Sequence, residues 1–164
     1  MLTLEPLRPD HAAAVLAFEL ANRAWFARTV PDRGDAYFTA AGFAERHAAL
    51  LAEQAEGTGR FHLVLGPDGA LVGRINLVDL VDGSAELGYR VAESAAGQGL
   101  AKAAVALVCR LAADAYGLHA LTAATTLDNP ASRAVLTGSG FTVTGQCRLG
   151  GHPGLRYRRA LDAS

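Results

Sequence analysis

The chain has 164 residues and a mass of 17.0 kDa, a length that predicts one domain spanning residues 1–164. Hydrophobic residues make up 51% of the chain and charged residues 19%, which excludes a disordered chain and provides enough apolar side chain for a sizeable core. The 15 Lys and Arg residues nearly balance the 16 Asp and Glu residues, and this near-neutral charge argues against a nucleic-acid-binding protein.

The number of cysteines and the residues at the N-terminus indicate in which cellular compartment the protein is expected. Cys109 and Cys147 are the only cysteines, too few for a disulfide-rich secreted scaffold. No apolar run reaches the roughly 18 residues of a membrane span. Residues 1–6 lack the basic and apolar segments of a signal peptide. We therefore expect a cytoplasmic protein with no membrane segment.

The N-terminal part of the chain predicts one strand and two helices. Residues 2–7 alternate in polarity as a short strand does, and Asp10 is a candidate N-cap for a helix over 10–23. Residues 25–37 break this pattern and predict a loop with at most a short helical turn. Apolar residues at helical spacing then predict a second helix over 43–57.

An antiparallel meander follows in the middle of the chain. The period changes to that of strands over 61–65, 71–80 and 85–91. Turn sequences separate these strands at 66–69 (GPDG) and 81–84 (VDGS).

The C-terminal part mixes helices and strands. We expect a helix over 99–116 that is apolar on most sides and therefore buried, and a strand over 118–126. A helix from 129 to 138–140 and closing strands over 141–149 and 155–161 complete the chain. The predicted order is β-α-α-β-β-β-α-β-α-β-β. This order indicates an α/β fold with a mixed, mostly antiparallel sheet and about four helices.

The strongest local chemical signal is Gly97-Gln98-Gly99, between the strand over 85–91 and the buried helix. Glycines allow positive φ and close backbone approach, and the start of a helix offers unpaired N–H groups to an anion. A pyrophosphate suits such a site; an ordinary tight turn is the alternative. Two phosphate motifs do not fit, because Lys102 stands where a dinucleotide fingerprint has its third glycine and lies at the wrong spacing for a P-loop.

Four segments together resemble the GNAT superfamily of N-acetyltransferases, and most nearly its ribosomal-protein N-terminal (Rim-type) acetyltransferases. They are 85–91 (AELGYRV), 97–101 (GQGLA), 129–133 (NPASR) and 139–141 (SGF), in the family's order and spacing. The predicted element order is also the family's. The resemblance implies a single-domain GNAT fold and an acetyl-CoA-dependent N-acetyltransferase. In that reaction a primary amine attacks the thioester directly within a ternary complex, without a metal.

The resemblance also implies roles for individual residues. Backbone groups of Tyr89, Arg90 and Val91 would pair with the pantetheine of acetyl-CoA, and a backbone N–H of the same strand would polarise the thioester carbonyl. Asn129 would bond the pantetheine, and Ser132 would lie near the CoA sulfur. The pyrophosphate would be cradled by Gly97, Gln98, Gly99, Leu100, Ala101 and Lys102.

The chain departs from the family pattern at two functional places. Ser94 stands where the family usually has Gln or Arg, so the phosphate contact falls to backbone N–H groups, with Lys102 and Arg133 as candidates to restore positive charge. Leu136 stands where many relatives carry the Tyr that protonates the departing thiolate. Ser132, or a water molecule, is then the candidate proton donor.

Glu86 is the candidate general base, because some relatives keep a base in this strand. Alternation places Glu86 and Gly88 on one face of the strand, and Leu87 and Tyr89 on the other. A solvated or structurally paired carboxylate is the alternative for Glu86. We expect Tyr89 to serve as a packing or wall residue rather than as an acid.

The acceptor is expected to be an amine-bearing small molecule or a protein N-terminus. An α-amine, with a pKa of about 7.8, is more often neutral at pH 7 than a lysine amine at about 10.4, which favours it at a weakly equipped site. A CoA-binding module without turnover and an acyltransferase for longer acyl chains remain alternatives. The five histidines show no metal-ligand spacing, so no metal is expected. Monomer and homodimer are both compatible with such a fold.

Two further residues are candidates for the acceptor side. Trp25 begins the irregular segment after the first helix, where it either anchors the core or walls the acceptor pocket. His152 lies in a predicted hairpin tip over 150–154 that fringes the acceptor site in this kind of fold.

Overall fold

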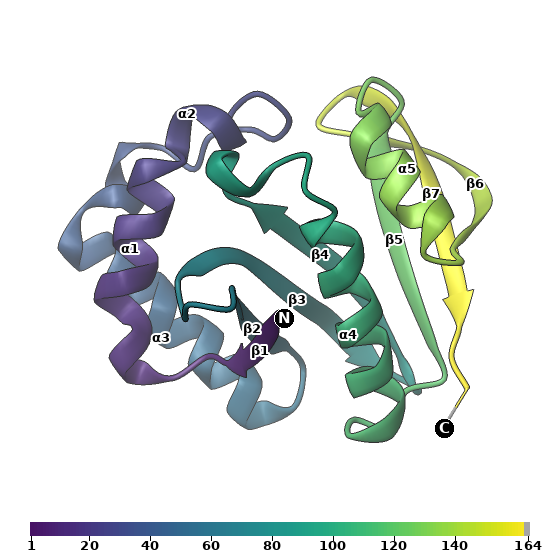
Figure 1. Cartoon of the computed structure of the whole chain (residues 1–164), viewed down its shortest axis with the longest axis horizontal. Coiled ribbons are helices and arrows are strands. Elements are labelled where there is room, and N and C mark those ends of the chain that lie inside the picture. Colours follow the sequence, from purple (N-terminus) through teal and green to yellow (C-terminus); the bar gives the residue numbers. More distant parts are fainter. Residues whose placement is uncertain (163–164) are drawn as a thin grey trace.

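The computed structural model describes residues 1–162, which form one β-sheet with helices on both faces (Figure 1). The strands are β1 (Thr3–Pro6), β2 (Arg60–Leu65), β3 (Leu71–Val81), β4 (Ser84–Val91), β5 (Ala120–Thr126), β6 (Thr142–Leu149) and β7 (His152–Ala160). The α-helices are α1 (Ala12–Ala21), α2 (Arg23–Phe26), α3 (Ala40–Glu56), α4 (Leu100–Asp114) and α5 (Pro130–Gly138). Three 3₁₀-helices are η1 (Pro9–His11), η2 (Asp35–Phe38) and η3 (Glu93–Ala95).

The sheet has seven strands in the order β1-β2-β3-β4-β5-β7-β6. Neighbouring strands are antiparallel except β4 and β5, which are parallel because α4 carries the chain back across the sheet between them. The predicted α/β class, mostly antiparallel sheet and element order are therefore confirmed. Residues 1–162 contain five α-helices rather than about four, because residues 23–26 form an additional short helix.

The helices divide between the two faces of the sheet, with α1 to α3 on the left of Figure 1 and α4 and α5 on the right. On the α4 side, Leu77 of β3 and Leu87 of β4 pack in one buried cluster with Val105 of α4. On the α1–α3 side, Phe61 of β2 packs in a second cluster with Phe43 of α3. Because neighbouring side chains of a strand point to opposite faces, β3 and β4 contribute to both sides of the molecule.

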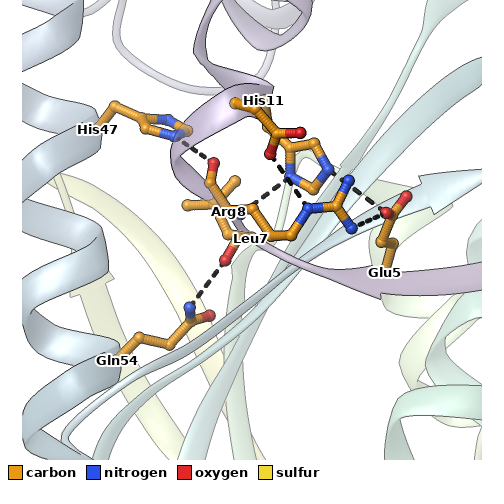
Figure 2. A network of polar contacts seen from close by, with 7 residues as sticks. Glu5, Leu7, Arg8, His11, His47 and Gln54 are labelled. Carbon is orange, nitrogen blue, oxygen red and sulfur yellow. Dashed lines mark hydrogen bonds and ion pairs between the residues drawn. The ribbon is translucent and has the colours of Figure 1, made fainter.

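Polar contacts fasten the segment after β1 to α3, as Figure 2 shows. The ring Nε2 of His47 donates to the carbonyl oxygen of Arg8 at 2.9 Å, and Nε2 of Gln54 donates to the carbonyl oxygen of Leu7 at 3.0 Å. These two bonds satisfy consecutive carbonyl groups that no ladder partner serves. The entry into α1 is thereby held against the long helix α3.

The start of α1 differs from the sequence prediction. Asp10 is not its N-cap; instead Oδ1 of Asp10 accepts from Nε of Arg8 at 3.1 Å. The backbone N–H of Arg8 donates to Nδ1 of His11 at 3.0 Å, and α1 begins only after this 3₁₀ turn, at Ala12. The predicted cap fails because Asp10 lies inside this 3₁₀ turn, so His11 and not Asp10 stands at the N-cap of α1.

The C-terminal hairpin is also tighter than predicted. Gly150 and Gly151 have φ of 56° and 82° and form a two-residue turn, a geometry that glycine adopts without steric cost. Leu149 therefore pairs with His152, which is an exposed residue of β7 rather than part of a long loop. The expected tip over 150–154 is thus wrong in its extent.

Candidate active site

A gap opens in the sheet where β4 and β5 separate (Figure 1). Within residues 1–162, the last pair in their parallel register is Glu86 with Thr122, although β4 continues to Val91 and β5 to Thr126. Backbone groups that lose their ladder partner in this way need another hydrogen-bonding group. The amides of a pantetheine arm are such groups.

Strand geometry decides which backbone groups of β4 face the gap. The N–H of Ala92 donates to the carbonyl of Val72 at 2.8 Å, so even-numbered residues direct their backbone groups toward β3. Tyr89 and Val91 accordingly direct theirs toward the gap. Arg90 does not, because its backbone belongs to the ladder with β3. Of the three residues expected to contact pantetheine through the backbone, two are therefore placed for it.

Trp25 closes the outer end of this gap. Its indole Nε1 donates to the carbonyl oxygen of Val91 at 3.1 Å, and its ring packs on a buried cluster that contains Phe18 and Phe26. The bond ties α2 to the end of β4. Trp25 is thus an anchor, and it takes the Val91 carbonyl while leaving the N–H of that residue free to face the gap.

The loop before α4 has the features of an anion cradle. Gly97 and Gly99 have φ of 75° and 73°, and a Cβ built on either would meet no atom within 4 Å. Gly99 is the N-cap of α4, and no side chain caps this helix. The first N–H groups of a fifteen-residue helix therefore face open space beside two residues without side chains. This arrangement suits a pyrophosphate group.

The other predicted members of the cradle lie around this loop. Gln98 is exposed and donates from Nε2 to the carbonyl of Ser94 at 3.1 Å, and Leu100 packs against the cluster that holds Trp25. Ala101 and Lys102 form the first turn of α4. The ammonium of Lys102 reaches the last turn of α5, where it lies 3.4 Å from the position of a Cβ at Gly138.

Asn129 caps α5. Its Oδ1 accepts from the backbone N–H of Ser132 at 3.2 Å, and Pro130 occupies the first helical position. The capping role is therefore established, while the contact with pantetheine stays a prediction. Arg133, on the next exposed turn, donates from Nη1 to the carbonyl of Leu127 at 3.2 Å.

Ser132 is joined to Tyr89 across the gap. The two hydroxyl oxygens are 3.2 Å apart, so a residue of α5 and a residue of β4 meet where the strands have separated. Burial raises the pKa of Tyr89, and the hydrogen bond with Ser132 opposes this shift only in part. Tyr89 is therefore a protonated hydroxyl beside Ser132. Leu136, which stands in the family's usual Tyr position, is buried in the core instead.

A cavity of about 290 Å³ lies on the opposite face of the sheet, between β3 and β4 on one side and α3 and η2 on the other. Gly88 lines it, and a Cβ at this position would meet no atom within 4 Å. Val78, the cross-strand partner of Glu86, also lines it. Leu87 packs on the α4 side, in line with the predicted alternation along β4. Glu86 therefore lies on the same face of the sheet as the cavity, next to Val78 but outside the residues that line it.

Glu19 is a buried charge that the sequence reading did not single out. Its carboxylate lies 3.2 Å from Nη1 of Arg74 and 2.7 Å from Nη1 of Arg90, and its exposed fraction is 1%. Helix α1 is thereby linked to β3 and β4 at the wall of the cavity. A single Glu in an apolar helix pattern gave no local signal of this role, because its partners lie 55 and 71 residues away.

Other features of the described chain fall outside this site. Cys109 is buried in α4, where burial raises the pKa of its thiol, and Cys147 is a second free cysteine. Within residues 1–162, no helix is long and apolar enough to cross a membrane. In the same range, His, Cys, Asp and Glu residues do not gather in groups of three or more that could hold a metal ion.

The gap, the glycine loop and the paired hydroxyl groups are the features expected at the site of an acetyltransferase. Residues 1–142 match the family model described as an acetyltransferase (GNAT) domain. The chain therefore belongs to the GNAT acetyltransferases. Comparison with curated protein sequences gives no match.

Solved structures similar to this chain include Rim-type acetyltransferases and a spermidine N-acetyltransferase. It is similar to RimJ of Mycobacterium smegmatis, solved in complex with CoA-disulfide, with 27% identity, a TM-score of 0.87, and coverage of 97% of this chain and 81% of that one. The ribosomal-protein-S5-alanine acetyltransferase of Vibrio fischeri has 19% identity, a TM-score of 0.90, and coverage of 98% and 93%. Spermidine N-acetyltransferase of Vibrio cholerae, solved with CoA and spermine, has 18% identity, a TM-score of 0.79, and coverage of 98% and 95%.

Proposed function

We propose that this protein transfers the acetyl group of acetyl-CoA to a primary amine, on a protein N-terminus or a small molecule, by direct attack within a ternary complex. The observation that carries the proposal is the position of Tyr89. Tyr89 is one of the residues that line the cavity on one face of the sheet, while its side-chain hydroxyl contacts the hydroxyl of Ser132 on the other face. An amine entering through the cavity and a thioester entering past α4 and α5 would therefore meet at the gap.

The groups around the gap suit the two proton transfers of this reaction. Acetyl-CoA supplies the activated acyl group, whose C–S bond breaks as the amine nitrogen bonds to the carbonyl carbon. Glu86, on the cavity face, accepts a proton from the amine. The N–H groups of Tyr89 and Val91 face the gap and can donate to the carbonyl oxygen. Ser132 passes a proton to the departing sulfur and takes one from the adjacent Tyr89 hydroxyl, which solvent then re-protonates.

The Ser132–Tyr89 pair is the candidate proton donor in place of the Tyr that many relatives carry at the position of Leu136. The absence of that Tyr is the reason to consider a CoA-binding module without turnover. Two adjacent hydroxyls, one of them held protonated by burial, offer a donor from different elements of the fold. This observation favours an enzyme over a binding module.

The names of the structural neighbours are compatible with an amine acceptor on a protein N-terminus or on a small molecule. One is described as acting on a ribosomal-protein alanine and another as a spermidine N-acetyltransferase. At these identities both likenesses concern the fold, so the acceptor of this protein has to be determined directly.

The test is release of free CoA thiol from acetyl-CoA in the presence of a panel of peptides, amino acids, polyamines and lysine derivatives. Amine-dependent thiol release with matching acetylated product supports the proposal. Binding of acetyl-CoA with no release for any amine would support the binding module instead. Faster release from propionyl-CoA or butyryl-CoA than from acetyl-CoA would identify an acyltransferase for longer chains.

A further inference from the structure

The cavity on the acceptor side has an unusual balance of charge. Within residues 1–162, its lining contains four arginines and no Asp or Glu. These are Arg33, Arg46, Arg74 and Arg90, contributed by the loop before η2, by α3, by β3 and by β4. Arginines from four segments thus converge on one space.

The buried Glu19 offsets only part of this charge. It is one carboxylate shared between two guanidinium groups, those of Arg74 and Arg90. Arg33 and Arg46 are exposed and add two further positive charges at the cavity rim. Burial lowers the pKa of Arg90, the Glu19 carboxylate opposes this shift, and the nearby Arg33 and Arg74 add to it, so a further anion would stabilise the charged guanidinium. The cavity is therefore suited to a negatively charged group and repels a polycation.

The floor of the cavity adds a neutral hydrogen-bond acceptor. Oδ1 of Asn76 is buried and has no hydrogen-bond partner, and Asn76 is opposite Gly88 in the β3–β4 register. A buried oxygen without a partner is costly unless a ligand supplies a donor. A backbone N–H of a peptide laid along β3 is such a donor.

The spacing along the strands sets the length of the acceptor. Glu86, Gly88 and Arg90 are successive residues on the cavity face of β4, opposite Val78, Asn76 and Arg74. Arg90 lies four residues along the strand from Glu86, which places their backbones about 14 Å apart at the usual rise. A free amino acid, in which amine and carboxylate are adjacent, covers little of this spacing. In a peptide, an acidic side chain at the second or third residue lies farther from the α-amine and covers more of it.

We infer that the acceptor is the α-amine of a peptide or protein N-terminus that carries an acidic side chain at its second or third residue. The arginines bind the carboxylate, Asn76 accepts from the peptide backbone, and the amine reaches Glu86. This inference rests on the proposed function and specifies its acceptor.

The experiment compares matched N-terminal tetrapeptide amides, AEAG, AAEG, AQAG and AKAG, with free glutamate and spermidine as further acceptors. We expect kcat/KM for AEAG or AAEG to exceed that for AQAG by about tenfold at low salt, the effect of one hydrogen bond to a charged group, and AKAG to be slower still. Arg46→Glu should reduce the ratio of AEAG to AQAG to about threefold or less, since it replaces an attraction with a repulsion. Arg110→Glu, on the exposed face of α4, is the matched control and should retain the ratio.

The outcomes separate this inference from the proposed function. Acetylation of AQAG or AKAG as fast as AEAG and AAEG would overturn the inference and leave an N-terminal acetyltransferase. A preference for spermidine would overturn it and leave a small-molecule acetyltransferase, and a preference for glutamate would show that the carboxylate is that of an amino acid. Failure of every amine would overturn both. An equal loss of ratio in Arg110→Glu would show a general charge effect and remove the cavity from the explanation.

Discussion

Gly99→Val tests the anion cradle, because two effects of the new side chain can be separated. The first is backbone strain: Gly99 has φ of 73°, and a left-handed conformation costs an L-residue roughly 1–2 kcal/mol. The second is loss of space, since the cradle is open at the position of the added Cβ. If a phosphate occupies that space, the Kd for acetyl-CoA should rise at least tenfold, about 1.4 kcal/mol.

Gly117→Val is the matched control. Gly117 has φ of 65° and is equally open, but it follows the opposite end of α4. Both variants should lose similar stability in thermal melts, while isothermal titration calorimetry well below the melting temperature should show weakened binding only for Gly99→Val. Gly99→Ala provides a smaller change if the valine variant does not fold. Unchanged affinity in folded Gly99 variants, or equal loss in the Gly117 variant, would refute the cradle.

Substitutions at five further residues test individual roles. Asn129→Ala should lower stability by about 1 kcal/mol through loss of the cap. Asn129→Asp keeps the capping oxygen and removes the amide donor, so a raised KM for acetyl-CoA in both variants indicates the pantetheine contact, and unchanged KM excludes it. Ser132→Ala should lower kcat by roughly tenfold to a hundredfold, Tyr89→Phe should lower it less, and equal rates in all three proteins would leave water as the donor. Glu86→Gln should lower kcat/KM and flatten its rise with pH for an α-amine acceptor, and an unchanged profile would remove Glu86 from the mechanism. Burial lowers the pKa of His62 below the value of about 6.5 in the unfolded chain, so its contribution to stability is present above that pH and is lost as the pH falls. In urea unfolding, His62→Gln should therefore reduce the dependence of stability on pH by up to about 1.4 kcal/mol per unit below pH 6.5, whereas exposed His152→Gln should not.

Local sequence signals predicted most of the fold. Alternation, helical spacing and the GPDG turn are properties of neighbouring residues, and the strands and helices that rest on them lie within a few residues of their expected ends. The errors are also local in origin. Asp10 is a suitable capping residue by type, but it lies in a separate 3₁₀ turn, and residue type does not reveal that α1 begins only after that turn. The predicted tip over 150–154 is too long, because the glycine pair at 150–151 completes the turn by itself.

The candidate site was only partly predictable for a different reason. The glycine loop and the Asn129 cap are continuous in sequence, and the motifs showed them. The contact between Tyr89 and Ser132 joins residues 43 apart, and it depends on how far β4 and β5 separate. The buried Glu19 and the arginines of the cavity likewise come from separate segments. Their convergence is a property of the folded chain, so spacing within the sequence cannot reveal it.

The central claim is direct transfer of the acetyl group to an amine at the gap between β4 and β5. Its most direct test is a matrix of initial rates in which acetyl-CoA and a productive amine are both varied, with thiol release and acetylated amine measured together. Direct transfer within a ternary complex predicts intersecting reciprocal plots and equal amounts of the two products. Parallel plots with an acetylated protein, or thiol release that does not depend on the amine, would contradict it.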